Sequence, residues 1–126
     1  MGEEWNFNEV FQIRTKKFAV NVIRFYVDNC KKSEELRVIG KQILRSGTSV
    51  ASNFRAFVRG RSEAERFSKL CIVVEEIDET LFWFELLEES NLVNQSLILT
   101  TKNEAFELLK VFSSVRSKIK KMKNEK

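Results

Sequence analysis

The sequence of 126 residues contains no proline and no histidine, and it has only four glycines and two cysteines. Proline and glycine form many of the tight turns that an all-β fold requires, so their scarcity argues against such a fold, whereas long helices lose nothing by it. The absence of histidine excludes histidine-containing zinc sites and the Glu-x-x-His di-metal sites of helix bundles. We therefore expect an all-α protein without a metal or another cofactor.

The two cysteines and the apolar segments give no sign of export or of a membrane. Cys30 and Cys71 lie on different predicted helices without metal-ligand spacing, so we interpret both as reduced packing residues. No apolar run approaches the roughly 20 residues of a membrane span. The polar residues Glu3, Glu4 and Asn6 interrupt the segment where a signal peptide would be apolar. These features predict a cytoplasmic protein without a membrane partner.

Four segments carry apolar residues at helical spacing, which predicts helices over residues of about 6–29, 34–59, 63–90 and 96–122. Asn6, Ser33 and Ser62 can cap the first three of these helices, and the fourth is expected to start within residues 94–101, where Thr101 and Glu104 form a further capping box. Connections of a few residues between such long helices favour antiparallel neighbours. We expect residues 1–126 to form a single domain, an antiparallel up-down-up-down four-helix bundle.

The second predicted helix has a heptad-like core stripe that includes two glycines, Gly40 and Gly47. A glycine inside a helix costs about 1 kcal/mol relative to alanine, so we expect these two to allow close approach of a neighbouring backbone or aromatic ring. Small polar residues lie beside the stripe: Ser46, Ser49 and Asn53. We predict that they lie at a helix interface and bond to backbone or to acidic residues of the third helix.

The third predicted helix has more apolar residues than one face of a bundle requires. Beyond its core stripe, several large apolar side chains point elsewhere on the helical wheel: Ile72, Val73, Phe82, Trp83, Leu86 and Leu87. Monomers rarely expose a contiguous apolar patch of that size, so all of these except Leu87 are candidates for an interface between subunits. The alternative is a broad helix face that is buried among three neighbours of the same chain.

Charge is distributed unevenly, although the net charge is only +4. Residues 31–69 include ten basic and four acidic residues, whereas residues 75–89 include seven acidic residues and no basic one. In one interpretation, arginines such as Arg55 pair with the carboxylates of Glu75, Glu76 or Asp78. In the other, an arginine-rich strip remains available for the phosphates of RNA or DNA: Arg45, Arg55, Arg59, Arg61 and Arg66.

Three stretches carry a resemblance to a known family: KKFAVNVIRFY, IGKQILRSGTSVASNFRAFVRGRSEAERFSKL and EEIDETLFWFELLEES. Between about Phe7 and Leu109, the chain resembles the four-helix-bundle family associated with intervening sequences of bacterial 23S ribosomal RNA genes. The resemblance implies an antiparallel bundle that assembles as a ring-like homopentamer, and members of the family have no established enzymatic activity.

A more distant resemblance is to the accessory variability proteins of diversity-generating retroelements. In these proteins a basic pentamer engages a reverse transcriptase and nucleic acid. By analogy, the resemblance implies candidate nucleic-acid contacts at Arg45, Arg55, Arg59 and Arg61.

Catalysis is not expected, because without histidine any acid–base chemistry would depend on the carboxylates of residues 75–89. These are interpreted more simply as a solvated or arginine-paired acidic face. We predict a non-enzymatic homo-oligomer that binds RNA or DNA through its arginine-rich surface. The alternative is a scaffold that binds another protein, such as a mobile-element product, and makes no nucleic-acid contact of its own.

Overall fold

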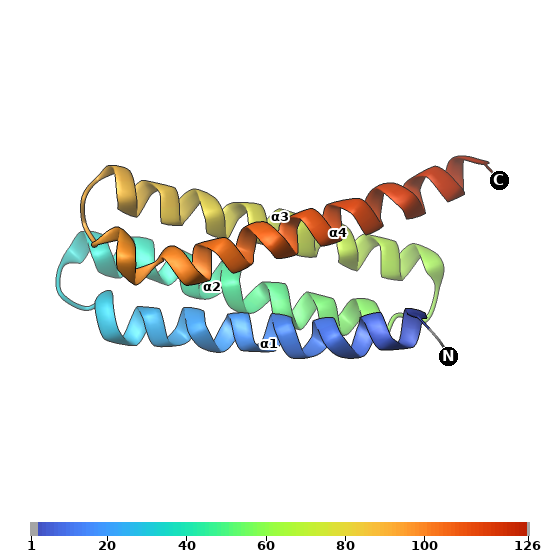
Figure 1. Cartoon of the computed structure of the whole chain (residues 1–126), viewed down its shortest axis with the longest axis horizontal. Helices are drawn as coiled ribbons and strands as arrows, with labels where there is room; N and C mark the ends of the chain where they lie inside the picture. Colours follow the sequence, from blue (N-terminus) through green and yellow to red (C-terminus); the bar gives the residue numbers. More distant parts are fainter. Residues whose placement is uncertain (1–2, 126) are drawn as a thin grey trace.

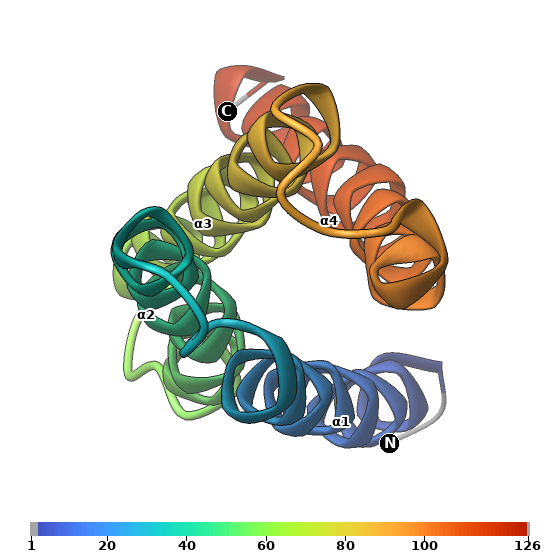
Figure 2. The same cartoon turned by 90° about the vertical axis from the view of Figure 1, so that its left-hand side faces the viewer.

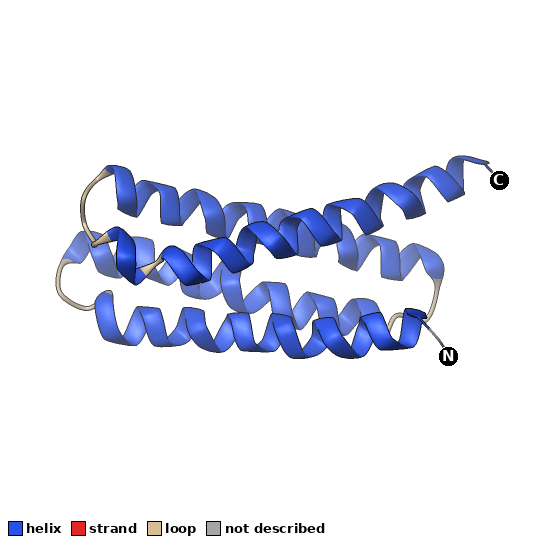
Figure 3. Cartoon of the chain, viewed as in Figure 1, coloured by secondary structure: helices blue, strands red, loops and turns tan. Residues whose placement is uncertain are grey.

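The computed structural model describes residues 3–125, which form four long α-helices and one short 3-10 helix (Figure 3). The long helices are α1 (Glu3–Asn29), α2 (Glu34–Val58), α3 (Glu63–Glu89) and α4 (Leu99–Glu125), and η1 (Gln95–Leu97) precedes α4. Each connection reverses the chain, so consecutive helices run antiparallel (Figure 1). For the described residues, the prediction of an all-α four-helix bundle is confirmed.

The four helices do not contact one another equally. Helix α2 packs extensively on α3 and on α1, and α4 packs on α3, whereas α1 and α4 contact each other only sparsely. Figure 2 shows that the helices follow one another round an arc, and that α1 and α4 cross at an angle. One bidentate ion pair joins these two: Arg14 Nε donates to Glu104 Oε2 at 3.0 Å, and a second guanidinium nitrogen donates to Oε1 at 2.5 Å. This hydrogen bonding raises the pKa of Arg14.

Two of the predicted helix caps are confirmed. Ser33 and Ser62 both have extended backbones, and their hydroxyl oxygens accept hydrogen bonds from the backbone N–H groups of Leu36 and Glu65 at 3.2 and 3.1 Å. Each bond satisfies a donor that has no partner inside the helix, which stabilises a helix by about 1 kcal/mol. The starts of α2 and α3 therefore follow from local sequence.

The other two predicted caps are wrong. Asn6 lies inside α1, which begins at Glu3, because the acidic residues before it are as compatible with a first helical turn as those after it. Thr101 lies inside α4, which begins at Leu99. The capping role falls to Asn94, whose side-chain oxygen accepts a hydrogen bond from the N–H of Ser96 at 3.0 Å and starts the 3-10 turn.

One continuous apolar core runs through the bundle, and phenylalanine rings dominate it toward the end that contains both termini. Phe54 of α2 and Phe112 of α4 are fully buried, with ring centroids 5.0 Å apart. Phe7 and Phe11 of α1 present their rings edge-on to Phe112, at 6.4 and 5.4 Å. Edge-on aromatic pairs add about 0.5–1.5 kcal/mol to the stabilisation that comes from buried area. Phe112 therefore links α4 to aromatic side chains of both α1 and α2.

Gly40 and Gly47 of α2 face α1 and Cys30, the residue that follows it. A Cβ atom added at Gly47 would lie 2.8 Å from both methyl groups of Val22, and one added at Gly40 would lie 2.5 Å from Cβ of Cys30. The predicted close approach is therefore confirmed, although the neighbours are chiefly these two side chains and, at Gly40, the ring of Tyr26 at 3.0 Å. Absence of a side chain lets the axes of α1 and α2 approach one another.

Helix α3 buries a broad arc of its surface because α2 and α4 flank it on both sides. Val73 and Leu87 are fully buried in the core of the same chain. The prediction that Val73 belongs to a subunit interface is therefore wrong, since its side chain has no surface to offer. Phe82 is half exposed, and Ile72, Trp83 and Leu86 are partly buried.

Within residues 3–125, no helix is both long and apolar enough to cross a membrane.

Candidate functional site

The five arginines of the predicted strip separate into groups with different surroundings, and Arg45 belongs to those with acidic partners. Its guanidinium donates to the carboxylate of Glu76 at 3.4 Å and to that of Glu79, both on α3. Its Nε also donates to the side-chain oxygen of Gln42 at 3.3 Å. Two carboxylates therefore neutralise Arg45, and it joins α2 to α3.

Arg66 is also engaged within the chain, at the turn between α2 and α3. Its Nε donates to the backbone carbonyl of Phe57 at 3.2 Å, and Cζ lies 4.9 Å from the centroid of the Phe57 ring. The same side chain covers Gly60, where an added Cβ atom would collide with Cγ of Arg66. These contacts give Arg66 a structural role in holding the end of α2 against the start of α3.

Arg55 and Arg59 differ from those two. Both are exposed on α2, and neither guanidinium has a hydrogen-bond or ion-pair partner among the described residues. The interpretation that Arg55 pairs with Glu75, Glu76 or Asp78 is wrong, because Arg55 lies on the side of α2 that faces α1. The pairing of arginine with the α3 carboxylates exists, but Arg45 makes it.

A groove between α1 and α2, with a volume of about 550 Å³, brings Arg55 and Arg59 together with Lys16 of α1. None of the described residues that line this groove carries a carboxylate. Ile13, Ala51 and Gln12 also line it. We call Lys16, Arg55 and Arg59 the cation cluster. It is a concentration of three positive charges with no opposite charge among the residues that line it.

The hydroxyl groups of the groove are already used by their own helices. Thr15 donates to the carbonyl of Phe11 at 2.7 Å, and Thr48 donates to the carbonyl of Leu44 at 2.7 Å. Ser52, also in the groove, donates to its own helix at 3.2 Å. Because a hydroxyl has one proton to donate, the strong donors that remain for a ligand are the cations and the amide of Gln12.

Two further charges bound the cluster. Arg61 is exposed in the turn after α2 and does not line the groove, and its backbone N–H donates to Glu65 Oε2 at 3.4 Å. The adjoining groove toward the start of α1 shares Gln12 and Ile13 and has Glu9 in its lining. The positive region therefore ends near Ile13 on α1.

The small polar residues of α2 make contacts inside the bundle. Ser46 is fully buried in the α2–α3 interface, with its Oγ 2.7 Å from Oγ1 of Thr80. Thr80 donates to the carbonyl of Glu76 at 2.8 Å, so Ser46 must donate in the shared bond. Asn53 Nδ2 donates to the carbonyl and hydroxyl oxygens of Ser49 at 3.0 and 2.8 Å. None of these groups faces the groove.

Replacing Thr80 with valine is expected to lower the free energy of unfolding by about 1–3 kcal/mol, because the buried hydroxyl of Ser46 loses the partner to which it donates. The double variant Ser46→Ala/Thr80→Val should recover part of this loss, since both polar groups are then absent. Urea unfolding of the single and double variants measures the coupling. Ser52→Ala, at an exposed position, is the control and should change stability by less than about 0.5 kcal/mol.

Two observations outside the groove concern nucleophilic chemistry and the binding of metal ions. Burial raises the pKa of the Cys30 thiol to about 11, so at neutral pH it is not the thiolate that acts as a nucleophile. Among residues 3–125, no three acidic or cysteine side chains come together in an arrangement that could hold a metal ion. The cation cluster remains the feature of the α1–α2 groove that bears most directly on the binding of a ligand.

The outer face of α1 carries an apolar stripe that the sequence patterns do not reveal. Ile13, Val20 and Val27 are seven residues apart and Ile23 lies between them, and all four are between 42% and 64% exposed. We call these four residues the α1 stripe. Their spacing keeps them on one side of the helix, opposite buried residues such as Val22. Among the described residues, α1 therefore has more exposed large apolar side chains than α3, where Phe82 is the most exposed of them.

The amino-acid sequence that forms this bundle of four antiparallel helices matches a known family. The family of 23S rRNA-intervening sequence proteins matches residues 8–114, and the chain belongs to that family. A similar solved structure comes from Bacteroides thetaiotaomicron and is described as a protein with unknown function from the S23 ribosomal protein family. It is 31% identical, with a TM-score of 0.77, over 87% of this chain and 97% of that one. No curated protein sequence matches the chain. The family resemblance inferred from the sequence is confirmed.

Proposed function

We propose that this protein is a cytoplasmic, non-enzymatic homo-oligomer that binds RNA or DNA through the cation cluster in the groove between α1 and α2. The observation that carries the proposal is the meeting of Lys16, Arg55 and Arg59 in a groove without a carboxylate. Arg55 and Arg59 are four residues apart, and like charges at this spacing destabilise a helix by about 0.2–0.5 kcal/mol. A polyanion that contacts both relieves this repulsion.

The chemistry of the groove favours phosphate contact over base recognition. Its hydroxyl groups are bonded to their own helices, so the contacts it offers are largely those of guanidinium and ammonium groups. Such groups bind phosphate oxygens, which position a nucleic acid but carry no sequence information. We therefore expect binding that is weakly selective for sequence and strongly dependent on salt.

Self-association is supported by two unlike surfaces of the bundle. The α1 stripe is apolar and is flanked by the exposed cations Lys17 and Arg24. Phe82, on α3, is 50% exposed and is flanked by the exposed carboxylates of Asp78 and Glu85. Contact between two different surfaces repeats from subunit to subunit and can close into a ring, as in the homopentamer that the family resemblance implies. Several weak phosphate sites in one ring then bind a strand with avidity.

Neutralising the cation cluster tests the proposal. The variant Lys16→Gln/Arg55→Gln/Arg59→Gln is expected to lower the slope of log affinity against log salt by about two to three units for each chain that contacts the strand, because three phosphate contacts per chain are lost. At physiological salt its affinity for single-stranded RNA should fall about 50-fold. Fluorescence anisotropy with labelled RNA and DNA over a range of salt concentrations measures both quantities.

A control variant with the same change of charge separates contact from general electrostatics. Lys31→Gln/Lys32→Gln/Lys41→Gln removes three exposed cations that line neither the groove nor the α1 stripe, and it should leave the affinity within a few-fold of the wild type. Equal losses in the two variants would contradict the assignment of the groove. Wild-type protein that binds no nucleic acid at low salt, but captures another protein in stoichiometric amount, would support the scaffold alternative instead.

A further inference from the structure

A second cavity lies at the end of the bundle where α1 begins and α4 ends. Its volume is about 590 Å³, within the range of about 300–1,000 Å³ that is usual for small-molecule sites, and all four helices contribute to its lining. In Figure 1, the last turns of α4 diverge from the first turns of α1 at this end. It shares no lining residue with the groove that contains the cation cluster.

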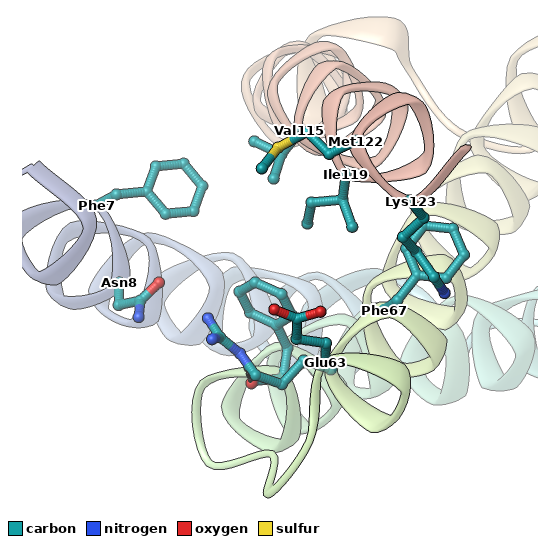
Figure 4. Close-up of a pocket in the computed structure, with 10 residues that line it drawn as sticks. Phe7, Asn8, Glu63, Phe67, Val115, Ile119, Met122 and Lys123 are labelled. Carbon is teal, nitrogen blue, oxygen red and sulfur yellow. Dashed lines mark hydrogen bonds between the residues drawn. The ribbon is translucent and has the colours of Figure 1, made fainter. Parts of the chain in front are cut away.

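The walls of this end cavity are apolar. Phe7, Phe57 and Phe67 form one part of them, and α4 supplies Val115, Ile119 and Met122. Figure 4 shows the side chains of Val115, Ile119 and Met122 directed into the same space as the ring of Phe7. Met122 is 60% exposed, and Phe7, Phe67, Val115 and Ile119 are only partly buried.

Covering these side chains would be favourable. Removal of large apolar side chains from water is favourable in rough proportion to the apolar area that a ligand covers. An apolar ligand body of matching size is therefore stabilised by contact with several walls at once.

Of the charged groups at the rim of the cavity, the cation of Lys123 has no ion-pair partner among the described residues. Glu63 and Arg66 line the cavity, and both interact with other groups of the chain. Lys123 also lines it, with Nζ 4.4 Å from the centroid of the Phe67 ring, and it forms no ion pair with the described residues. A cation over an aromatic ring keeps its remaining N–H donors directed away from the ring, where an acceptor can reach them. The rim is therefore complementary to one negative charge.

We propose that the end cavity binds one amphipathic monoanion of the class of a medium-chain carboxylate. The alkyl chain lies against the phenylalanine rings and the apolar side chains of α4, and the carboxylate accepts hydrogen bonds from the ammonium group of Lys123. A charge-assisted hydrogen bond of this kind fixes the orientation of the ligand, and the apolar walls supply most of the affinity. This site is independent of the proposed nucleic-acid contact.

Isothermal titration calorimetry with decanoate, below its critical micelle concentration, tests the proposal. Decanoate should bind saturably with one molecule per chain, and decanol and decylammonium should bind at least about tenfold more weakly. The variant Lys123→Gln should reduce the affinity for decanoate about tenfold and leave that for decanol unchanged. Lys121→Gln, at an exposed position on α4 outside the cavity, is the matched control and should behave as the wild type.

A second variant tests the apolar part of the site. Ile119→Trp fills the cavity and should abolish the binding of both decanoate and decanol, with circular dichroism showing an intact helical fold. Three results would each overturn the proposal: absence of saturable decanoate binding, decylammonium binding as tightly as decanoate, or equal decanoate affinity in Lys123→Gln and the wild type. Because Lys123 is exposed, its substitution does not put the fold at risk.

Discussion

Replacing Phe112 with alanine lowers the free energy of unfolding by about 3–5 kcal/mol, which is a large part of the total stability of a typical domain. Its ring is fully buried and lies within 6.4 Å of the rings of Phe7, Phe11 and Phe54, measured between centroids. The substitution therefore removes buried area and three aromatic contacts together. It also leaves a cavity where α1, α2 and α4 meet, which neighbouring rings can fill only in part.

Phe106 provides the matched control for this prediction, because it is a phenylalanine on the same helix that is 41% exposed. Phe106→Ala should cost about 1 kcal/mol or less, since no cavity forms and its ring is not enclosed. Urea unfolding of both variants, followed by circular dichroism, gives the comparison. Similar losses in the two variants would show that Phe112 does not hold the three helices together.

Much of the fold could be predicted from sequence because its determinants are local. Ser33 and Ser62 cap helices through bonds to residues three positions later, and the helical spacing of apolar residues identifies each segment. The incorrect caps at Asn6 and Thr101 have the same local form, so local chemistry alone could not distinguish them. Where several polar residues follow one another, more than one of them can begin the helix with similar stability. The first helical residue is then ambiguous from sequence alone.

The surroundings of the arginines could be predicted only in part. Arg45 and Arg55 are ten residues apart, so they lie about 80° apart round α2, and the sequence contains this angle. The sequence does not show on which side of α2 each neighbouring helix packs. In the structure, α3 lies beside Arg45 and α1 lies beside Arg55. For the same reason, no sequence pattern indicates that Lys16 of α1 lies in the same groove as Arg55 and Arg59 of α2.

The exposed apolar side chains lie mainly on a different helix from the one predicted, for a related reason. Helix α3 is the richer in large apolar residues, but α2 and α4 flank it and bury Val73 and Leu87. Helix α1 is at the end of the arc, and its Val20 and Ile23 side chains are each 42% exposed. The number of apolar residues in a helix therefore says less about subunit contact than the number of helices that flank it.

Introducing charge into the α1 stripe tests whether that surface joins subunits. The double variant Val20→Glu/Ile23→Glu is expected to convert the proposed homo-oligomer entirely into monomers while the bundle keeps its fold. Both side chains are 42% exposed, so glutamate is tolerated in the single chain. In an interface, the change removes roughly 1.5–3 kcal/mol of apolar burial at each position and places two carboxylates where they would lose water. Sedimentation velocity at fixed protein concentration measures the mass.

The control for this variant is Leu97→Glu/Leu99→Glu, because these residues are 50% and 55% exposed and lie at the end of η1 and the start of α4, outside the α1 stripe. It should sediment as the wild type does. The monomeric variant keeps Lys16, Arg55 and Arg59, so each chain retains its phosphate contacts, but the affinity for a long strand should fall about 100-fold or more because avidity is lost. A wild-type protein that is monomeric at high concentration would contradict the proposed ring, and it would leave each groove to bind phosphate alone.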